Sequence, residues 1–329
     1  MTPLIRIEAD GADVTDRLRD RLIDLRLHDA AGYKADTLTM TLDDRDGVLV
    51  VPPSQSTVTV SLGLLGARAV PLTRMGSFLI DEVQLTGPER RMILSGSAAA
   101  MGTDIRAPRT RAWEGVTLGA MVATIAEEAG LTPSVDPELA GLALPFVAQT
   151  AESNLHILTR VARQIGAVFK PADGHLLVAR RGADTNAAGQ PLPVLRLLPS
   201  ELTSWSWRAA ERDRYASAEA SWTDLATGQV TRVVVGDGTP RRVLRHVYRS
   251  EDEARRSAQA ALNGAGQGAE TARLQCAGFR PDAFAGARLR FADTRPEWAG
   301  DWSVTAATHV LNATLTTDLE LERPLPKGA

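Results

Sequence analysis

Alternation of apolar and polar residues with a period of two is the feature that most constrains the fold of this chain. Near the N-terminus it occurs in Leu38–Leu42 and Thr57–Leu62. After residue 270 it recurs in four segments, namely Ala272–Cys276, Ala287–Phe291, Trp302–Ala306 and Leu319–Leu321. This period is typical of β-strands that bury one face. Both ends of the chain are therefore predicted to be rich in β-sheet.

A hairpin is also predicted within the N-terminal part. The segment Thr86–Glu89 contains Gly87 and Pro88, two residues that favour turns. It separates Phe78–Leu85 from Arg91–Leu94, which both have strand composition. The two segments are therefore expected to pair with each other.

Residues 14–27 fit two different structures. Leu25 and Leu27 alternate with polar neighbours, which suits a strand. Leu18, Leu22 and Leu25 are spaced four and three residues apart, which suits a helix equally well. The local pattern does not decide between them.

Between residues 106 and 195 the period changes to that of helices. Thr117 is a possible N-cap of one helix, and Gly130 is placed to end it. Ser153 and Gly166 bound a second helix in the same way. The apolar faces of the two helices consist of Leu118, Met121, Val122 and Ile125 in the first and Leu155, Leu158, Val161, Ala162 and Ile165 in the second.

A second hairpin and a long loop follow these helices. Val168–Lys170 and Leu176–Val178 flank Pro171–Gly174, which has the composition of a turn. Residues 181–193 are rich in Gly, Ala, Asn, Gln and Pro and are predicted to be a loop or linker. The pattern does not specify its structure.

One helix is predicted within the sheet-rich C-terminal part. Ser250 and Glu253 form a capping box, and the helix is expected to run to about Asn263. Its small apolar face is suited to lying close against a sheet and consists of Ala254, Ala258, Ala261 and Leu262. The glycines that follow it are interpreted as a helix stop, because a phosphate-binding loop would precede a helix; they are Gly264, Gly266 and Gly268.

Charge and composition exclude several classes of protein. The chain has 37 Lys and Arg residues against 40 Asp and Glu, a net charge of −3, and no basic stripe of the kind that holds nucleic acid. No apolar run approaches the roughly 20 residues that span a bilayer, and the charged start of the chain does not fit a signal peptide. The single Cys276 cannot form an internal disulfide. Synthesis in the cytoplasm, without membrane insertion or specific nucleic-acid binding, is expected.

A calcium loop is suggested only superficially by Asp44, Asp46 and Gly47. With Gly47 as the sixth loop residue, the first and twelfth would be Leu42 and Pro53, whose side chains carry no oxygen. The segment is therefore predicted to be an acidic turn.

No catalytic, metal-binding or cofactor-binding residues are predicted. No serine lies in a G-x-S-x-G motif, and Cys276 occupies a predicted strand in which a buried thiol is inert. The histidines are scattered and form no H-E-x-x-H pair; they are His28, His156, His175, His246 and His309. The chain is therefore expected not to be an enzyme.

Tryptophan is concentrated in the C-terminal part of the chain. Five of the six tryptophans follow residue 200, namely Trp205, Trp207, Trp222, Trp298 and Trp302. Core packing is the ordinary role of such residues. Trp205 and Trp207 would share one face of a strand, so a surface that contacts another subunit is the alternative for this pair.

An ordered set of segments resembles a known family. The segments are Leu38–Gly47, Val58–Gly63, Ala151–Phe169, Gly300–Val304 with Thr308 and His309, and Asp318–Glu322. Each is weak alone, but together they span nearly the whole chain. The set resembles the phage late control D family, tail hub proteins related to the hub portion of valine-glycine-repeat spike proteins of contractile injection systems. Ala172–Gln190 and the C-terminal tail are not diagnostic.

The resemblance implies a β-rich α+β fold with two tube-like β-barrel domains and a small α/β domain between them. Residues 1–105 would form the first barrel, and residues 106–195 an α/β domain with two helices and a hairpin. Residues 196–329 would form the second barrel, with one helix and a loose C-terminal tail. The family also favours a strand over a helix at Leu22–Leu27.

The resemblance further implies a structural role. Three chains would form a ring of six similar barrels that joins the sixfold tail tube to the threefold spike and leaves a central channel. The implied partners are two more copies, tail tube or baseplate proteins, and a spike on a separate polypeptide, because the chain stops at Ala329. The protein would be part of a virion tail or a tail-like particle, and the kind of particle is not specified.

Two other functions serve as alternatives. A tail-associated cell-wall hydrolase would need convergent carboxylates or a metal cluster. A carbohydrate-binding module would need Trp205 and Trp207 exposed in a groove.

Overall fold

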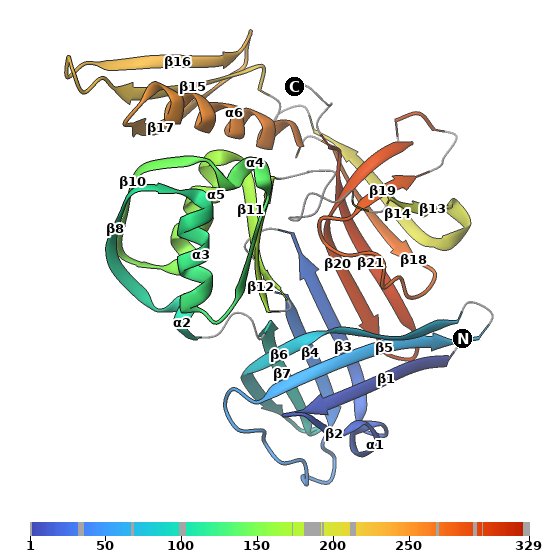
Figure 1. Cartoon of the computed structure of the whole chain (residues 1–329). Coiled ribbons are helices and arrows are strands. Elements are labelled where there is room, and N and C mark those ends of the chain that lie inside the picture. The colour runs from blue at the N-terminus through green and yellow to red at the C-terminus, as the bar shows by residue number, and fades with distance from the viewer. Residues whose placement is uncertain are drawn as a thin grey trace.

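Strands predominate over helices in this protein, as the alternating pattern predicts. The computed structural model describes residues 2–31, 36–66, 69–98, 103–172, 174–180, 192, 194–210, 215–267, 270–291, 295–297 and 299–324. Figure 1 shows two β units, an α/β unit beside them and a smaller sheet with a long helix at one end. The β-rich α+β class is therefore confirmed.

The first β unit comes from the N-terminal part of the chain. Its elements are β1 (Thr2–Ala9), β2 (Ala12–Asp13), α1 (Thr15–Leu18), β3 (Leu22–Ala30), β4 (Thr37–Asp43), β5 (Thr57–Leu65), β6 (Val70–Thr86) and β7 (Arg91–Ala98). The strand order is β2-β1-β5-β6-β7-β4-β3. Alternate side chains, such as Leu38, Met40 and Leu42 on β4, point into one buried core. The predicted hairpin between β6 and β7 is confirmed.

The α/β unit packs helices between two sheets. Its elements are α2 (Thr103–Arg106), β8 (Pro108–Thr117), α3 (Leu118–Glu128), β9 (Thr132–Val135), α4 (Pro137–Ala140), β10 (Ala143–Ser153), α5 (Asn154–Ile165), β11 (Ala167–Ala172) and β12 (His175–Arg180). β8 pairs with β10, and the other sheet has the order β11-β12-β9. Helices α3 and α5 lie between these sheets (Figure 1).

Both predicted helices of the α/β unit are confirmed together with their caps. The Thr117 hydroxyl accepts a hydrogen bond from the Ala120 N–H at 3.2 Å. The Ser153 hydroxyl accepts one from the His156 N–H, also at 3.2 Å. Gly166 ends α5 with a φ of +68°, a conformation that favours glycine.

The second β unit comes from the C-terminal part. Its elements are β13 (Val194–Leu197), the 3₁₀ turn η2 (Pro199–Glu201), β14 (Leu202–Ala209), β18 (Glu270–Cys276), β19 (Arg288–Phe291), β20 (Gly300–Leu311) and β21 (Leu315–Glu322). The strand order is β13-β19-β20-β21-β18-β14. Its core surrounds Trp302, Phe291 and Leu289, which are almost completely buried.

Strand β20 belongs to both β units. Its first residues pair with β19, whereas Ala306–Leu311 pair with Ala30–Leu25 on β3. The two units therefore share one 13-stranded sheet. Pairing of β3 with both β4 and β20 shows that residues 22–27 form a strand, as the family resemblance favours.

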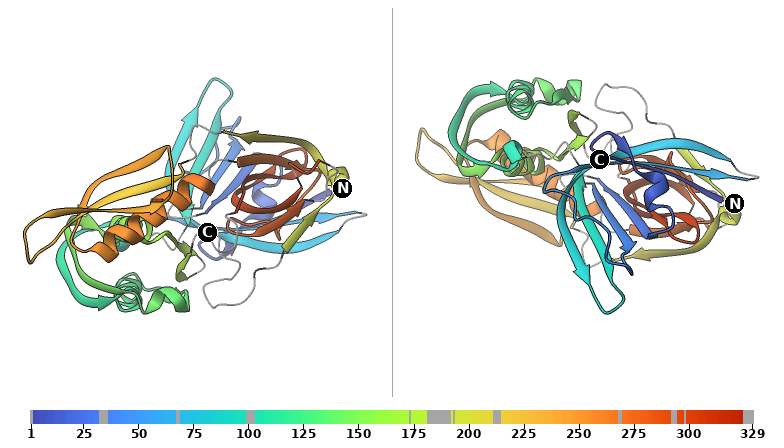
Figure 2. Two further views of the ribbon diagram at one scale, coloured as in Figure 1. Left: turned by 90° about the horizontal axis from the view of Figure 1, so that it is seen from above. Right: turned by 90° about the horizontal axis from the view of Figure 1, so that it is seen from below.

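The segment between β14 and β18 forms a separate two-layer piece. Strands β15 (Ser217–Thr223), β16 (Val230–Gly236) and β17 (Arg241–Tyr248) form a sheet of order β16-β15-β17. Helix α6 (Glu251–Gln267) covers one face of it and also contacts α5 of the α/β unit. Figure 2 shows this piece at the end of the molecule away from the N-terminus.

The described strands form no closed ring of pairs. Pairing runs from β14 at one end to β2 at the other, and β13 is attached through β19. The structure therefore shows two β units with separate cores that share a sheet. The two tube-like β-barrel domains stay a prediction.

Three local predictions differ from the structure. Helix α6 passes Asn263 and includes Gly264 and Gly266, because packing on the β15–β17 sheet and α5 outweighs the low helix propensity of glycine. In the capping box, Ser250 accepts from the Glu253 N–H as predicted, but Glu253 accepts from the Arg249 N–H. The hairpin turn is shorter than predicted, since β11 continues to Ala172.

Some predictions fall outside the described residues. These are Gly268, Trp298, most of the 181–193 loop and the tail after residue 324. Within the described chain, no helix has both the length and the apolar character needed to cross a membrane.

Candidate functional site

Among the described residues, no group of three or more His, Cys, Asp and Glu side chains could hold a metal ion. Asp46, from the calcium-like segment, instead forms an ion pair with Arg21 at 2.6 Å. Cys276 is buried, and this burial raises its thiol pKa to about 12. A thiol with that pKa is protonated at neutral pH and does not act as a nucleophile.

A mostly buried ion cluster joins three parts of the chain. It consists of Asp29 on β3, Asp36 just before β4, and Lys170 on β11 of the α/β unit. The Lys170 Nζ lies 2.8 Å from Asp36 Oδ1 and also contacts Asp29 Oδ1. The other Asp29 oxygen accepts a hydrogen bond from the Ala285 N–H at 2.8 Å, in the second β unit.

Burial shifts the pKa values of the side chains in this cluster. Burial raises the pKa of Asp36 to about 7, and the nearby Asp29 charge acts in the same direction. Burial alone would favour the neutral amine of Lys170, but the two carboxylates outweigh it and raise the Lys170 pKa. The contacts of the cluster link separate segments of the chain. We therefore interpret it as a structural cluster that holds these segments together. Sequence reasoning missed it because its members are far apart in the sequence.

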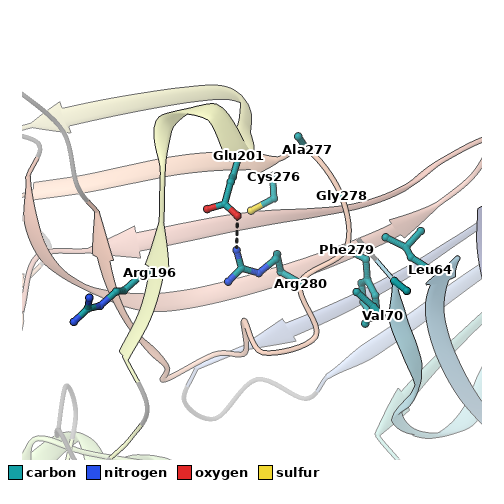
Figure 3. Close-up of a pocket in the computed structure, with 10 residues that line it drawn as sticks. Leu64, Val70, Arg196, Glu201, Cys276, Ala277, Gly278, Phe279 and Arg280 are labelled. Atoms are coloured by element: carbon teal, nitrogen blue, oxygen red, sulfur yellow. Dashed lines mark ion pairs between the residues drawn. The ribbon is translucent and has the colours of Figure 1, made fainter. Parts of the chain in front are cut away.

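A hollow of about 280 Å³ lies at the seam between the two β units (Figure 3). Leu64 and Val70 line it from the first unit, and the segment Cys276–Arg280 lines it from the second. Arg280 forms an ion pair with Glu201 at 3.7 Å and donates two hydrogen bonds to Asp282, both at 3.0 Å. The charge of Arg280 is thus already neutralised within the chain.

The predicted contact residues lie on an exposed strand. Trp205 and Trp207 are 49% and 37% exposed, and every residue of β14 after Leu202 is exposed. Their register partners on β18, Leu274 and Ala272, are buried. In the described part of the chain β14 pairs only with β18, so it is the last strand of the sheet at this end.

The other tryptophans follow the default expectation of packing. Trp302 is completely buried, Trp113 is buried in the core of the α/β unit, and Trp222 is partly buried against α6 and its sheet. Trp205 and Trp207 are therefore more exposed than the other tryptophans that the structure describes.

Sequence reasoning also missed a second exposed surface. Four valines on β16 and β17 are exposed, namely Val230, Val234, Val243 and Val247. The available signal was the alternation of valine with arginine in these two strands.

Comparisons with known proteins agree on one family. A sequence model described as phage tail baseplate hub (GPD) matches residues 58–315. The probable baseplate hub protein of Escherichia phage P2 is 28% identical over 365 aligned positions, covering 98% of this chain and 93% of that protein.

Solved structures share the fold at low sequence identity. The 43 kDa tail protein of prophage MuSo2 from Shewanella oneidensis has a TM-score of 0.73 and 16% identity, covering 98% of this chain and 99% of the other. The Escherichia coli c3393 protein has a TM-score of 0.55 and 12% identity, covering 99% of this chain and 78% of the other. It is described as a type VI secretion component that is structurally similar to T4 tail proteins gp27 and gp5.

Proposed function

The chain belongs to the phage tail baseplate hub family, and from this membership we propose that three copies form a ring joining the sixfold tail tube to the threefold spike. In this proposal residues 1–105 and 196–329 supply two tube-like β domains per copy, and residues 106–195 lie between them. The ring encloses a central channel. Its partners are a separate spike protein and tail tube or baseplate proteins.

The observation that carries this proposal is the shared sheet. Backbone hydrogen bonds between β3 and β20 hold two β units with separate cores side by side (Figure 2). Six such units from three chains would match a sixfold tube on one side, while the chain itself repeats three times for a threefold spike. A wall of this kind acts by its shape, so we propose that it works without catalysis or a cofactor.

We further propose that β14 contributes to the contact between copies. A cyclic trimer needs two different patches on each chain, which meet after a threefold rotation. Trp205 and Trp207 supply a large exposed apolar area on the last described strand of the sheet. Aromatic side chains of this kind are enriched at protein interfaces.

Counting copies in assembled tails by cryo-electron microscopy tests the ring. Three copies are expected, and one copy or none would contradict the proposal.

The double substitution Trp205→Ser with Trp207→Ser is expected to reduce the number of assembled particles about tenfold, since interface aromatics often contribute 2 kcal/mol or more. Tyr215→Ser, at a similarly exposed aromatic residue just before β15, is the control and should assemble normally.

The two alternative functions make different predictions for the same proteins. A cell-wall hydrolase would clear peptidoglycan in a zymogram of the purified chain, and we expect no clearing. A carbohydrate-binding module would lose glycan binding in the Trp205 and Trp207 variant while assembling normally. Loss of glycan binding with normal assembly would contradict the proposed role of β14 in the contact between copies.

A further inference from the structure

The sheet of β15, β16 and β17 is covered on one side only. Helix α6 packs on the face that carries Ala218, Ala220 and Val233, and its own Ala254 and Ala258 are completely buried there. By strand alternation, the opposite face carries Val230 and Val234 of β16 and Val243 and Val247 of β17. We name this opposite side the outer sheet face.

The outer sheet face is apolar where a solvent-facing sheet is normally polar. Its four valines are 60%, 39%, 62% and 45% exposed, in chain order. Val234 and Val243 both pair in register with Glu219 on the central strand, so they flank it in one row across the sheet. The valines therefore form a group on neighbouring strands and are not scattered singly over the surface.

This face also carries a positive charge. Glu219 is its one acidic residue on the three strands, and it is already paired with Arg232 at 3.5 Å and Arg241 at 3.2 Å. Arg245 lies between Val243 and Val247 on β17 and is exposed. Three arginines against one carboxylate leave an excess of positive charge beside the valines, although the whole chain is negative.

We propose that the outer sheet face is a docking surface for an acidic segment with aliphatic side chains, supplied by a different protein of the tail particle. Aliphatic residues of the segment cover the four valines, and its carboxylates pair with Arg245 and with the outer sides of Arg232 and Arg241. Complementary charge of this kind selects the partner and fixes its register. Two copies of this chain packed face to face through this surface would instead oppose the same arginines, which disfavours a twofold contact here.

This surface is distinct from the one proposed for the ring. The β15–β17 sheet is separate from the 13-stranded sheet that contains β14, and Figures 1 and 2 show it to one side of the two β units. The inference rests on the proposed hub function only for the statement that its partner is another tail protein.

Site-specific crosslinking in purified particles tests the inference. The photoreactive residue benzoylphenylalanine replaces Val234 or Val243, and mass spectrometry identifies the crosslinked peptides. We expect peptides from another tail protein that contain both Asp or Glu and aliphatic residues. Leu225, which is 81% exposed but lies in the turn between β15 and β16, is the matched control position and should give no such product.

Charge variants give an independent measurement. Arg245→Glu is expected to reduce the crosslink from Val243 about tenfold, and Arg245→Lys, which keeps the charge, should largely retain it. Both variants leave the pairs of Glu219 intact, so circular dichroism should show the fold unchanged. Added salt should also weaken the crosslink, because exposed charge pairs are screened.

Several outcomes would overturn the inference. Crosslinks to a second copy of this chain, crosslinks to segments without acidic residues, or no crosslink at Val234 and Val243 in assembled particles would each do so. Particles that contain three copies but give no crosslink would refute the docking surface and leave the hub function standing. Absence of the chain from the particles would refute the hub function itself.

Discussion

Lys170 joins the α/β unit to the first β unit through ion pairs with Asp29 and Asp36. Lys170→Met would leave the mostly buried Asp29 and Asp36 without their cation. We expect the free energy of unfolding, measured by urea denaturation, to fall by about 3 kcal/mol. The control is Arg6→Ala, which breaks a half-exposed pair with Glu8 and should cost no more than about 1 kcal/mol. Similar losses for both variants would contradict the role of the ion cluster.

Asp36 should make stability depend on pH in a direction unusual for a carboxylate. Its folded-state pKa is raised by burial to about 7, above the ordinary value of 3.8. The stability contributed by its protonated form is therefore complete below about 4 and is lost as the pH rises through 7. In Asp36→Asn this loss is absent, so the variant should gain stability relative to the wild type between pH 5 and pH 8, measured by urea denaturation.

His309 makes stability depend on pH in the opposite direction. Its contribution must therefore be distinguished from that of Asp36. Burial lowers its pKa to about 4, so its contribution is present above its ordinary value of 6.5 and is lost as the pH falls toward 4. Comparing Asp36→Asn with the wild type cancels this term, because both proteins keep His309. A difference in stability that does not change with pH would show that Asp36 is ionised throughout the range.

At the scale of the elements, Gly96 on β7 allows the close approach of β6 and β7. A Cβ atom at this position would lie 2.6 Å from the Leu79 carbonyl oxygen on β6. Gly96→Ala must therefore push the two strands apart, and we expect it to lower the free energy of unfolding by about 1–3 kcal/mol. Gly141→Ala, where a Cβ meets open space, is the matched control and should be nearly neutral in the same denaturation experiment. Equal effects would contradict the close approach.

Elements whose signals are local could be predicted from the sequence, and those set by distant contacts could not. Thr117 and Ser153 cap their helices through residues only three positions away. Residues 22–27 have no such local signal, because pairing with β4 and β20 determines that they form a strand. The ion cluster around Lys170 was unpredictable for the same reason, since only the fold brings its members together.

At the scale of the whole molecule, pairing of β3 with β20 makes the two β units one continuous body. The alternating pattern predicts that both ends of the chain are rich in β-sheet, and the family resemblance adds the expectation that they form two similar units. The structure adds how they are joined: Phe279, Leu311 and Leu315 from the C-terminal part are buried in the core of the first unit. The boundaries at residues 105 and 195 stay predictions, because separate cores do not by themselves delimit domains that fold alone.

The shared sheet predicts which parts of the molecule unfold together. In native-state hydrogen exchange, the amides of β3 and β20 should report the same opening free energy within about 1 kcal/mol, because neither strand can leave without breaking both cores. The α/β unit has its own core between two sheets, so β11 and β12 should open separately and at lower free energy. Exchange of β3 at a much lower free energy than β20 would mean that the units separate along this seam. The proposed ring around a channel requires the first result, since a seam that opens independently would let the ring come apart within a single chain.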